Sequence, residues 1–336
     1  MKINNRRYIG CKTKLLDFIY DSVERYNISK DSVFADIFAG TGVVAYRFAL
    51  EGYKTILNDT LFSNYVIYKT IFNNEIMRID LLKNEINYFN SIVSDSLKAN
   101  YFSNTYGGKY YSFDNAKKIG FIRDYIEENK QKYNEREYYY LITCLLYACD
   151  KIANTVGHFE SYLHSAPKGE KLMLEEFEMN SNLPESYIYN EDANNLAKKI
   201  NADIVYIDPP YNARQYVNFY HVLENLARWN KPTEFEGKSM KFKRDNLKSD
   251  YCRSKAPLLF EDLIQSLKCK LIVVSYNNTY NAKSVSSNNT ISEDQIIEIL
   301  SKKGNVTIKT IDYSAFNAGK TDLKNHKEYL YICEVF

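Results

Sequence analysis

The sequence predicts an α/β fold built on a doubly wound, mostly parallel sheet. Short apolar runs rich in β-branched residues recur near both ends of the chain and alternate with helical patterns. The first run, 33–38, leads into a glycine-containing turn and a helical pattern over 43–50, which is typical of a βαβ unit. A later run, 203–207, stops at two prolines, as a buried strand that ends in a turn does.

The strands are expected in chain order at 33–38, 54–57, 187–190, 203–207, 270–275, 305–312 and 328–335. The first three alternate with helical segments and are expected to pair in parallel. The last two are separated by a loop without room for a crossover helix. They are therefore expected to form an antiparallel β-hairpin at one edge of the sheet.

A mainly helical insertion is expected in the middle of the chain, because little strand signal lies between Leu61 and Ser186. Helical patterns cover 62–73, 77–99, 114–129 and 135–153. A chain of 336 residues can bury a large core. The expected organisation is one α/β domain made of 1–60 and 187–336, a helical insertion at 61–186, and a basic loop at 231–255.

Composition excludes several classes of protein. The net charge is only +2, so a binder of nucleic acid that works by bulk charge alone is not expected. No apolar run approaches the length of a membrane span, and the basic N-terminus has no apolar segment behind it to form a signal peptide. The cysteines lack paired zinc spacing and lie mostly in apolar surroundings. A cytoplasmic protein with reduced thiols, and with no metal, is expected.

The turn after the first strand favours close approach of a ligand. Gly40 and Gly42 let the backbone come near, and the helix that follows offers unpaired N–H groups. The full Gly-x-Gly-x-x-Gly spacing and the Gly-Lys-Ser/Thr of a phosphate-binding loop are both absent, so ATP is not expected. The next strand ends at Asn58-Asp59, where an acidic residue suits the hydroxyls of a ribose.

The segment Asp208-Pro209-Pro210-Tyr211 carries the strongest chemical signal. The aspartate can accept a hydrogen bond from an exposed amine. The prolines stiffen the turn and remove two backbone donors. The tyrosine offers a flat face on which a base can stack. Together these residues suit a planar group with an exocyclic NH2, and the alternative interpretation is a rigid turn without a ligand.

With these motifs in this order, the chain resembles the Dam-like, alpha-group N6-adenine-specific DNA methyltransferases, which use S-adenosylmethionine. The N-terminal segment from Arg7 to Lys12 is similar to that family's first cofactor motif, and the segment from Asp36 to Gly42 to its glycine-rich motif. Glu191-Asp192-Ala193 and Ser275-Tyr276-Asn277 are weaker matches to later motifs. The resemblance implies a Rossmann-like sheet of the class I methyltransferase type.

The resemblance also implies residue roles. Asp208, Pro209, Pro210 and Tyr211 would form the catalytic motif, which receives a base flipped out of the duplex. Asp208 and the Pro209 carbonyl would accept hydrogen bonds from the adenine amine, with no covalent intermediate. Residues implied to contact S-adenosyl-L-methionine are Tyr8, Gly10, Lys12, Asp36, Phe38, Ala39, Gly40, Gly42, Asp59, Asp192, Ala193 and Asp208. The insertion at 61–186 would read the DNA sequence, the alternative being a helical lid without base contacts.

Two loops carry nucleic-acid signals. The stretch 154–171 is irregular and mildly basic, and it begins with an Asn-Thr-x-Gly-x-Phe pattern similar to one in the family. His158, within it, is interpreted as a polar loop residue rather than a catalyst. The basic loop at 231–255 suits phosphate contacts, although a solvated loop is an equal alternative. The residues expected to contact DNA are Lys168, Arg214, Lys241, Lys243 and Arg244.

The function expected from the resemblance is site-specific methylation of the adenine N6 amine in double-stranded DNA. The chain would be an orphan methylase or the modification component of a restriction–modification system, with a cognate restriction endonuclease acting on the same site. The absence of a Pro-Cys dipeptide argues against cytosine C5 methylation. The alternatives are cytosine N4 methylation, methylation of RNA or protein glutamine, and a catalytically silent DNA-binding subunit.

Overall fold

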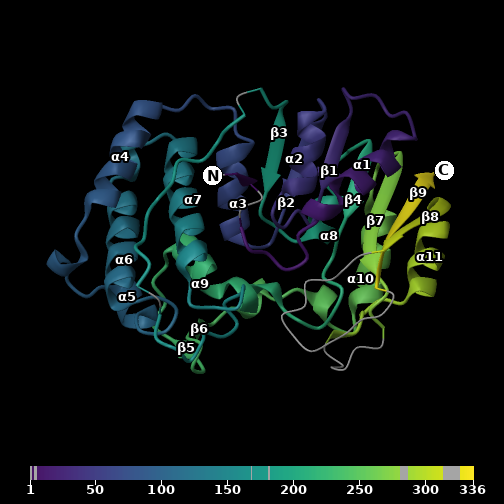
Figure 1. Cartoon of the computed structure of the whole chain (residues 1–336). Helices are drawn as coiled ribbons and strands as arrows, with labels where there is room; N and C mark the ends of the chain where they lie inside the picture. The colour runs from purple at the N-terminus through teal and green to yellow at the C-terminus, as the bar shows by residue number, and fades with distance from the viewer. Residues whose placement is uncertain (1, 4–5, 168, 181, 281–286, 313–325) are drawn as a thin grey trace. The chain divides into compact units, whose positions relative to one another are not determined.

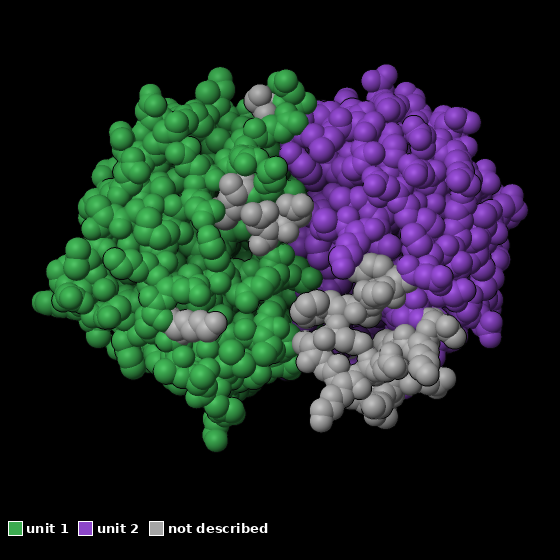
Figure 2. Space-filling view, viewed as in Figure 1, with its two compact units in different colours: residues 1–8, 61–182, 217–246 green, residues 9–60, 183–216, 247–336 purple. Residues whose placement is uncertain are grey.

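The computed structural model describes residues 2–3, 6–167, 169–180, 182–280, 287–312 and 326–336. By its internal contacts the chain divides into two units, coloured separately in Figure 2. Unit 1 contains Met1–Tyr8, Leu61–Asn182 and Val217–Asn246. Unit 2 contains Ile9–Thr60, Leu183–Tyr216 and Leu247–Phe336. No helix in the described ranges is long and apolar enough to cross a membrane.

Unit 2 is built on a seven-stranded sheet with the order β3-β2-β1-β4-β7-β9-β8 (Figure 1). The strands are β1 (Val33–Asp36), β2 (Lys54–Asn58), β3 (Ser186–Tyr189), β4 (Ile204–Ile207), β7 (Leu271–Asn277), β8 (Gly304–Asp312) and β9 (Lys327–Val335). The pairs among the first five are parallel, whereas β9 is antiparallel to both β7 and β8. The predicted fold class, with its C-terminal hairpin at one edge, is confirmed.

The helices of unit 2 cover both faces of this sheet. They are α1 (Leu16–Glu24), α2 (Val43–Leu50), α8 (Ala193–Ala197), α10 (Ala256–Ser266) and α11 (Glu293–Ser301), with short 3-10 turns at Thr13–Leu15 and Asp250–Cys252. Alternation along the strands assigns Ile37 and Val205 to the core shared with α8, α10 and α11. On the other face Phe34 stacks on Phe48 of α2 with ring centroids 3.8 Å apart.

Unit 1 is mainly helical. Its elements are α3 (Phe62–Ile71), α4 (Ile79–Ser91), α5 (Tyr101–Tyr106), α6 (Phe113–Glu128), α7 (Glu135–Ile152) and α9 (Tyr216–Arg228, in this unit from Val217), 3-10 turns at Ser94–Ser96 and Lys130–Lys132, and a small hairpin of β5 (Phe235–Glu236) and β6 (Lys241–Phe242). A further 3-10 turn, Asp245–Leu247, spans the boundary.

The helix predicted over 77–99 was too long. It ends at Ser91, because the β-branched residues Ile92 and Val93 adopt extended backbone conformations. A separate helix then begins after Asn100, whose side chain accepts a hydrogen bond from the Ser103 N–H while the Ser103 hydroxyl accepts one from the Asn100 N–H. This capping box is a start signal that the apolar periodicity alone did not indicate.

Buried carboxylates hold the helices of unit 1 together at their ends. Glu224 of α9 is fully buried and accepts hydrogen bonds from the N–H groups of Phe62 and Ser63, both at 2.9 Å. These donors have no partner within α3 because they lie in its first turn. Arg228 forms an ion pair with the same carboxylate at 2.6 Å. The start of α3 is therefore fixed by a residue far away in the sequence.

Glu137, at the start of α7, has a similar role. Its side chain is fully buried and accepts hydrogen bonds from the backbone and guanidinium of Arg78, and it closes a capping box with Asn134. The Arg78 guanidinium, and secondarily the backbone donors, lower the pKa of Glu137 to about 2 against the opposing effect of burial.

We expect Glu137→Gln, which retains the shape needed for the capping box, to destabilise the protein by ~2 kcal/mol near neutral pH. Because the pKa is lowered on folding, this contribution is present above the unfolded value near 4.5 and is lost as the pH falls toward about 2. Thermal unfolding followed by circular dichroism at several pH values measures it. A destabilisation that stays constant down to about pH 3 would contradict the ion-pair explanation.

Candidate active site

The parallel strands of unit 2 bring several acidic residues to one edge of the sheet. β1 ends at Asp36, β2 is followed by Asp59, and β4 is followed by Asp208. Carboxyl ends of parallel strands meet at the same edge, where open α/β sheets bind ligands. The charges of Asp59 and Asp208 both act on Asp36, which shows that the three predicted carboxylates lie near one another.

The glycine turn between β1 and α2 has the geometry that the sequence predicted. Gly40 and Gly42 have φ values of 53° and 78°, a region that disfavours side chains. The Gly40 N–H donates to Asp59 Oδ2 at 2.9 Å, and the Ala39 N–H donates to the Asn58 carbonyl at 2.9 Å. The turn is thus fastened to the end of β2, and Gly42 leads directly into α2.

Asp36 is the most unusual residue of this edge. Its side chain is only 1% exposed, and neither carboxylate oxygen makes a hydrogen bond of standard geometry within the described residues. Burial, with the charges of Asp208 and Asp59 added, raises the pKa of Asp36 well above its ordinary value, and the nearby N–H groups of Ala45 and Phe38 oppose the rise. Buried acceptors without donors fit a ligand that carries a cationic or N–H group.

Asn58 connects the ends of the first three strands. Its amide donates to the carbonyls of Ile37 and Glu191 at 3.1 and 3.0 Å, and its carbonyl accepts from the Glu191 N–H at 3.0 Å. Within the same loop Asp192 accepts from the Asn195 N–H at 3.0 Å and so caps α8, whose first residue, Ala193, is buried. The segment that was a weak match to the family is thereby held beside Asp59.

The Asp208–Tyr211 turn forms a tight polar cluster with Lys12. The Lys12 ammonium lies 3.0 Å from Asp208 Oδ2 and donates to the Tyr211 hydroxyl at 3.0 Å. The Tyr211 hydroxyl in turn donates to Asp208 Oδ1 at 2.5 Å. The Asp208 side chain is 17% exposed, so its carboxylate is not sealed from a ligand. One basic side chain therefore holds both polar members of the motif.

Two residues of this cluster were not among the predicted catalytic or cofactor residues. Ser275 of β7 and Glu328 of β9 lie 3.3 and 3.5 Å from the Tyr211 hydroxyl. Glu328 is 5% exposed, and its burial, with the charge of Asp208, raises its pKa to about 7 against the opposing effect of Lys12. No motif marks Glu328; an acidic residue just before the apolar run Tyr329–Cys333 is its signal in the sequence.

The remaining predicted cofactor residues occupy defined positions. Gly10 has a φ of 78°, and a Cβ there would lie 3.0 Å from the Tyr216 hydroxyl oxygen. Phe38 packs edge-on against Tyr251, with ring centroids 5.1 Å apart. Tyr8 belongs to unit 1, where its ring stacks on Tyr220 at 4.5 Å. Within the described ranges, no group of three or more His, Cys, Asp or Glu side chains is arranged to hold a metal ion.

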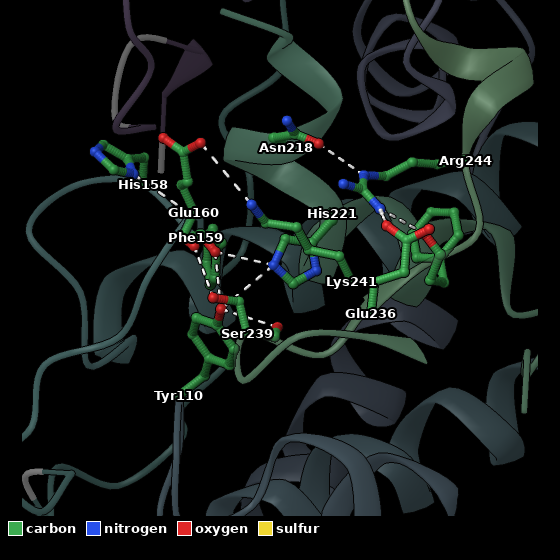
Figure 3. Close-up of polar contacts among 11 residues, drawn as sticks. Tyr110, His158, Phe159, Glu160, Asn218, His221, Glu236, Ser239, Lys241 and Arg244 are labelled. Carbon is green, nitrogen blue, oxygen red and sulfur yellow. Dashed lines mark hydrogen bonds and ion pairs between the residues drawn. The ribbon is translucent and has the colours of Figure 1, made fainter. Parts of the chain in front are cut away.

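In unit 1, the loop after α7 and the β5–β6 hairpin are joined by buried polar contacts (Figure 3). The Phe159 carbonyl accepts from the Tyr110 hydroxyl at 2.8 Å and lies 2.9 Å from His221 Nε2. The Tyr110 hydroxyl also lies 3.1 Å from the Ser239 carbonyl, and the Ser239 hydroxyl donates to the Glu160 carbonyl at 2.9 Å. The two predicted nucleic-acid loops therefore share one scaffold over these residues.

His221, which the sequence did not indicate, is the buried centre of that scaffold. Burial lowers its pKa to about 3, so its ring is neutral at physiological pH. His158 is partly exposed, and its Nδ1 accepts a hydrogen bond from the Glu160 N–H at 3.3 Å. The interpretation of His158 as a polar loop residue stays a prediction.

The residues predicted to contact DNA differ in exposure. Lys243 and Arg214 are exposed, and Lys241 is half-buried 3.9 Å from Glu160. Arg244 is 6% exposed, and its guanidinium binds Asn218 at 2.7 Å and Glu236 at 2.8 Å (Figure 3). Its DNA contact stays a prediction, and the observed contacts fasten the hairpin to α9. Lys168 lies outside the described residues.

Comparison with known proteins is consistent with this geometry. The family model of the D12 class N6 adenine-specific DNA methyltransferases matches residues 8–291. The modification methylase StsI of Streptococcus sanguinis is 38% identical over 341 residues, covering 96% of this chain and 50% of that protein. The Type II methyltransferase M.NlaIII of Neisseria lactamica is 34% identical over 346 residues, covering 97% of this chain and 98% of that protein.

A third relative, the Type II methyltransferase M.FokI of Planomicrobium okeanokoites, is 34% identical over 316 residues, covering 89% of this chain and 47% of that protein. The chain therefore spans about half the length of the StsI and FokI proteins and nearly the whole length of the NlaIII protein.

We expect Asp36→Asn to be more stable than the wild type at about pH 8, by ~1–2 kcal/mol, because burial and the charges of Asp208 and Asp59 oppose ionisation of the Asp36 carboxyl. The pKa of Asp36 is raised on folding, so the wild type loses stability as the pH rises above about 4, and the advantage of the variant grows over that range. Thermal unfolding at several pH values measures the difference. Exposed Asp31→Asn is the control, and equal stability of Asp36→Asn and wild type at about pH 8 would contradict the argument.

Proposed function

Because the chain belongs to the D12 class of N6 adenine-specific DNA methyltransferases, we propose that it transfers a methyl group from S-adenosylmethionine to the N6 amine of adenine at specific sites in DNA. The family that the sequence motifs predicted is confirmed by the match over residues 8–291. The roles proposed for individual residues rest on one observation. The glycine turn and Asp36, whose oxygens have no hydrogen bond of standard geometry among the described residues, lie near Asp208 at one edge of the sheet.

The residues present fit S-adenosylmethionine. The buried oxygens of Asp36 suit its ammonium group, and the backbone at Gly40 and Gly42 allows close approach. Asp59, held at the end of β2 by Gly40, would accept hydrogen bonds from the ribose hydroxyls, with the loop at Asp192 beside it. Bound there, the sulfonium supplies an electrophilic methyl group, and no metal is needed for this transfer.

The chemistry proposed for Asp208 and Tyr211 follows from the weakness of the nucleophile. The lone pair of the adenine amine is delocalised into the ring, and a base inside a duplex is out of reach until it is flipped out. Asp208 and the Pro209 carbonyl would accept hydrogen bonds from the amine and stabilise the positive charge that develops on nitrogen. The ring of Tyr211 would stack on the flipped base.

DNA contacts are proposed for unit 1 and for the segment that follows the catalytic motif. Lys241 and Lys243 lie on or beside the β5–β6 hairpin, and exposed Arg214 follows Tyr211 closely in the chain. Such side chains position a duplex through its phosphates, whereas sequence is read by contacts to base edges. The helical segment 61–186 is the proposed reader of the target sequence, and a cognate endonuclease is the proposed partner.

The test is to express the chain in a bacterial host that lacks adenine methylation and to sequence its DNA with modified-base detection. The proposal expects N6-methyladenine at one recurring sequence. N4-methylcytosine would instead support the alternative specificity, and unmodified DNA from cells that contain the folded protein would contradict methyl transfer.

We expect Asp208→Ala to retain binding of S-adenosylmethionine and to lower the rate of methyl transfer ~100-fold or more, since a lost transition-state contact of ~3 kcal/mol has that effect. Transfer of tritiated methyl groups to duplex DNA measures the rate. Exposed Asp21→Ala on α1 is the matched control. An Asp208→Ala protein that keeps more than about a tenth of the wild-type rate would show that Asp208 is not catalytic.

We expect Asp59→Ala to weaken S-adenosylmethionine binding ~10-fold or more, since a charge-assisted hydrogen bond is worth ~1.5–3 kcal/mol. Isothermal titration calorimetry measures the affinity, with Asp21→Ala again as control. Because Asp59 also accepts the Gly40 N–H, circular dichroism should confirm that the fold is kept. An unchanged affinity would place the ribose elsewhere.

A further inference from the structure

The Tyr211 hydroxyl connects four side chains that come from separate segments of unit 2. Lys12 from the N-terminal segment, Asp208 after β4, Ser275 of β7 and Glu328 of β9 all lie within 3.5 Å of its oxygen. The ring itself packs on Tyr276, with centroids 4.4 Å apart at 51°. The ring of Tyr211 thus lies between Tyr276 and the Lys12 ammonium, which is 5.0 Å from the ring centroid, and the hydroxyl faces charged groups.

The Tyr211 hydroxyl has fewer protons than it has neighbouring carboxylate acceptors. The phenol has a single proton, which lies closest to Asp208 Oδ1 at 2.5 Å, and the Lys12 ammonium neutralises the other Asp208 oxygen at 3.0 Å. Glu328 Oε2 is 3.5 Å from the same phenol oxygen. The charge of Lys12 lowers the pKa of Glu328, but the ion pair of Lys12 is with Asp208. Glu328 is thus a buried acceptor one hydroxyl away from the proposed catalytic carboxylate.

We propose that Glu328 accepts, through the Tyr211 hydroxyl, the proton that the adenine amine loses on methylation. This inference rests on the proposed function. The N6 lone pair forms the bond to the methyl carbon, and the carbon–sulfur bond breaks with its electron pair left on sulfur. The nitrogen would then carry one proton more than the N-methylated product does, so we propose that this proton leaves as the bond to the methyl carbon forms.

The proton shift balances once the Tyr211 O–H, which donates to Asp208 Oδ1 in the structure, turns to Glu328 Oε2. The surplus proton moves from N6 to Asp208, Asp208 passes a proton to the Tyr211 oxygen, and the phenol proton passes to Glu328 Oε2. Asp208 ends as a carboxylate, Tyr211 as a neutral phenol and Glu328 as a carboxylic acid. No oxidant or further reactant is required, and the proton leaves Glu328 for solvent before the next turnover.

The surroundings of Glu328 support this role. The titratable or charged groups that act on it are Lys12, Asp208, Tyr211 and the buried phenol of Tyr206. Burial raises the pKa of Glu328 to about 7, so its carboxylate is a stronger base than an ordinary one and accepts a proton near neutral pH. Glu328 acts through Tyr211 and is a positioning residue, since it does not itself touch the base.

The experiment measures single-turnover methyl transfer from about pH 5.5 to about pH 9, on a duplex that carries the sequence found by modified-base detection. The wild-type rate is expected to rise through about pH 7 as Glu328 ionises. Glu328→Gln keeps the shape but cannot accept a proton, so its rate at about pH 8 should fall ~10–100-fold and lose this inflection. Its affinity for S-adenosylmethionine should stay within about twofold.

Three companion variants sharpen the test. Glu328→Asp should recover part of the rate together with the inflection. Tyr211→Phe keeps the stacking ring but removes the hydroxyl, so it should lose the inflection as Glu328→Gln does. The double variant should be no slower than the slower single variant, because both interrupt one relay. Glu334→Gln, an exposed residue on the same strand, is the control with wild-type behaviour.

The outcomes distinguish a failure of the proton relay to Glu328 from a failure of the proposed methyltransferase function. A wild-type protein that leaves adenine unmethylated contradicts the proposed function and the relay with it. An active wild type whose inflection near pH 7 persists in folded Glu328→Gln contradicts the relay alone. Should Glu328→Gln not fold, Tyr211→Phe decides: loss of the inflection supports the relay, and retention overturns it.

Discussion

Parallel pairing of β1 with β2 and β4 is the constraint on which the site depends. It directs the carboxyl ends of these strands to one edge and so forces Asp36, Asp59 and Asp208 toward one another. Like charges at such distances repel, and burial adds to the penalty. The Lys12 ammonium contacts Asp208 and the Gly40 N–H donates to Asp59, which lowers this repulsion. Asp36, in contrast, has no hydrogen bond of standard geometry among the residues that the structure describes.

The residues of the candidate site therefore lower the free energy of unfolding. A buried carboxyl group whose oxygens have no hydrogen bond of standard geometry among the described residues opposes folding, and it persists because the surrounding sheet is well packed. By contrast, the buried carboxylates of unit 1, such as Glu224 and Glu137, have donors and support helix ends. The same side chain chemistry thus supports stability in one unit and is proposed to bind the ligand in the other.

Sequence reasoning identified those parts of the protein that local patterns specify. The apolar strands, the glycine turn and the Asp208–Tyr211 motif are contiguous in sequence, and each has its own chemical signature. The position of Glu328 beside Tyr211 was not predicted, because it depends on which strands β9 pairs with. The order β7-β9-β8 places Glu328 opposite Asn277 and Ile311, and a two-residue period cannot reveal such a long-range partner. The start of α5 was missed because a capping box, not periodicity, defines it.

The antiparallel insertion of β9 between β7 and β8 has a consequence for sequence divergence. Along a strand, successive side chains point to opposite faces, so shifting β9 by one residue would turn Glu328 away from the Tyr211 hydroxyl and bring a neighbour in its place. Glu334 is the exposed residue of β9, so its side chain is the one most free to vary. The length of β9 is constrained by this register, and single-residue insertions or deletions within it should be rare among functional homologues.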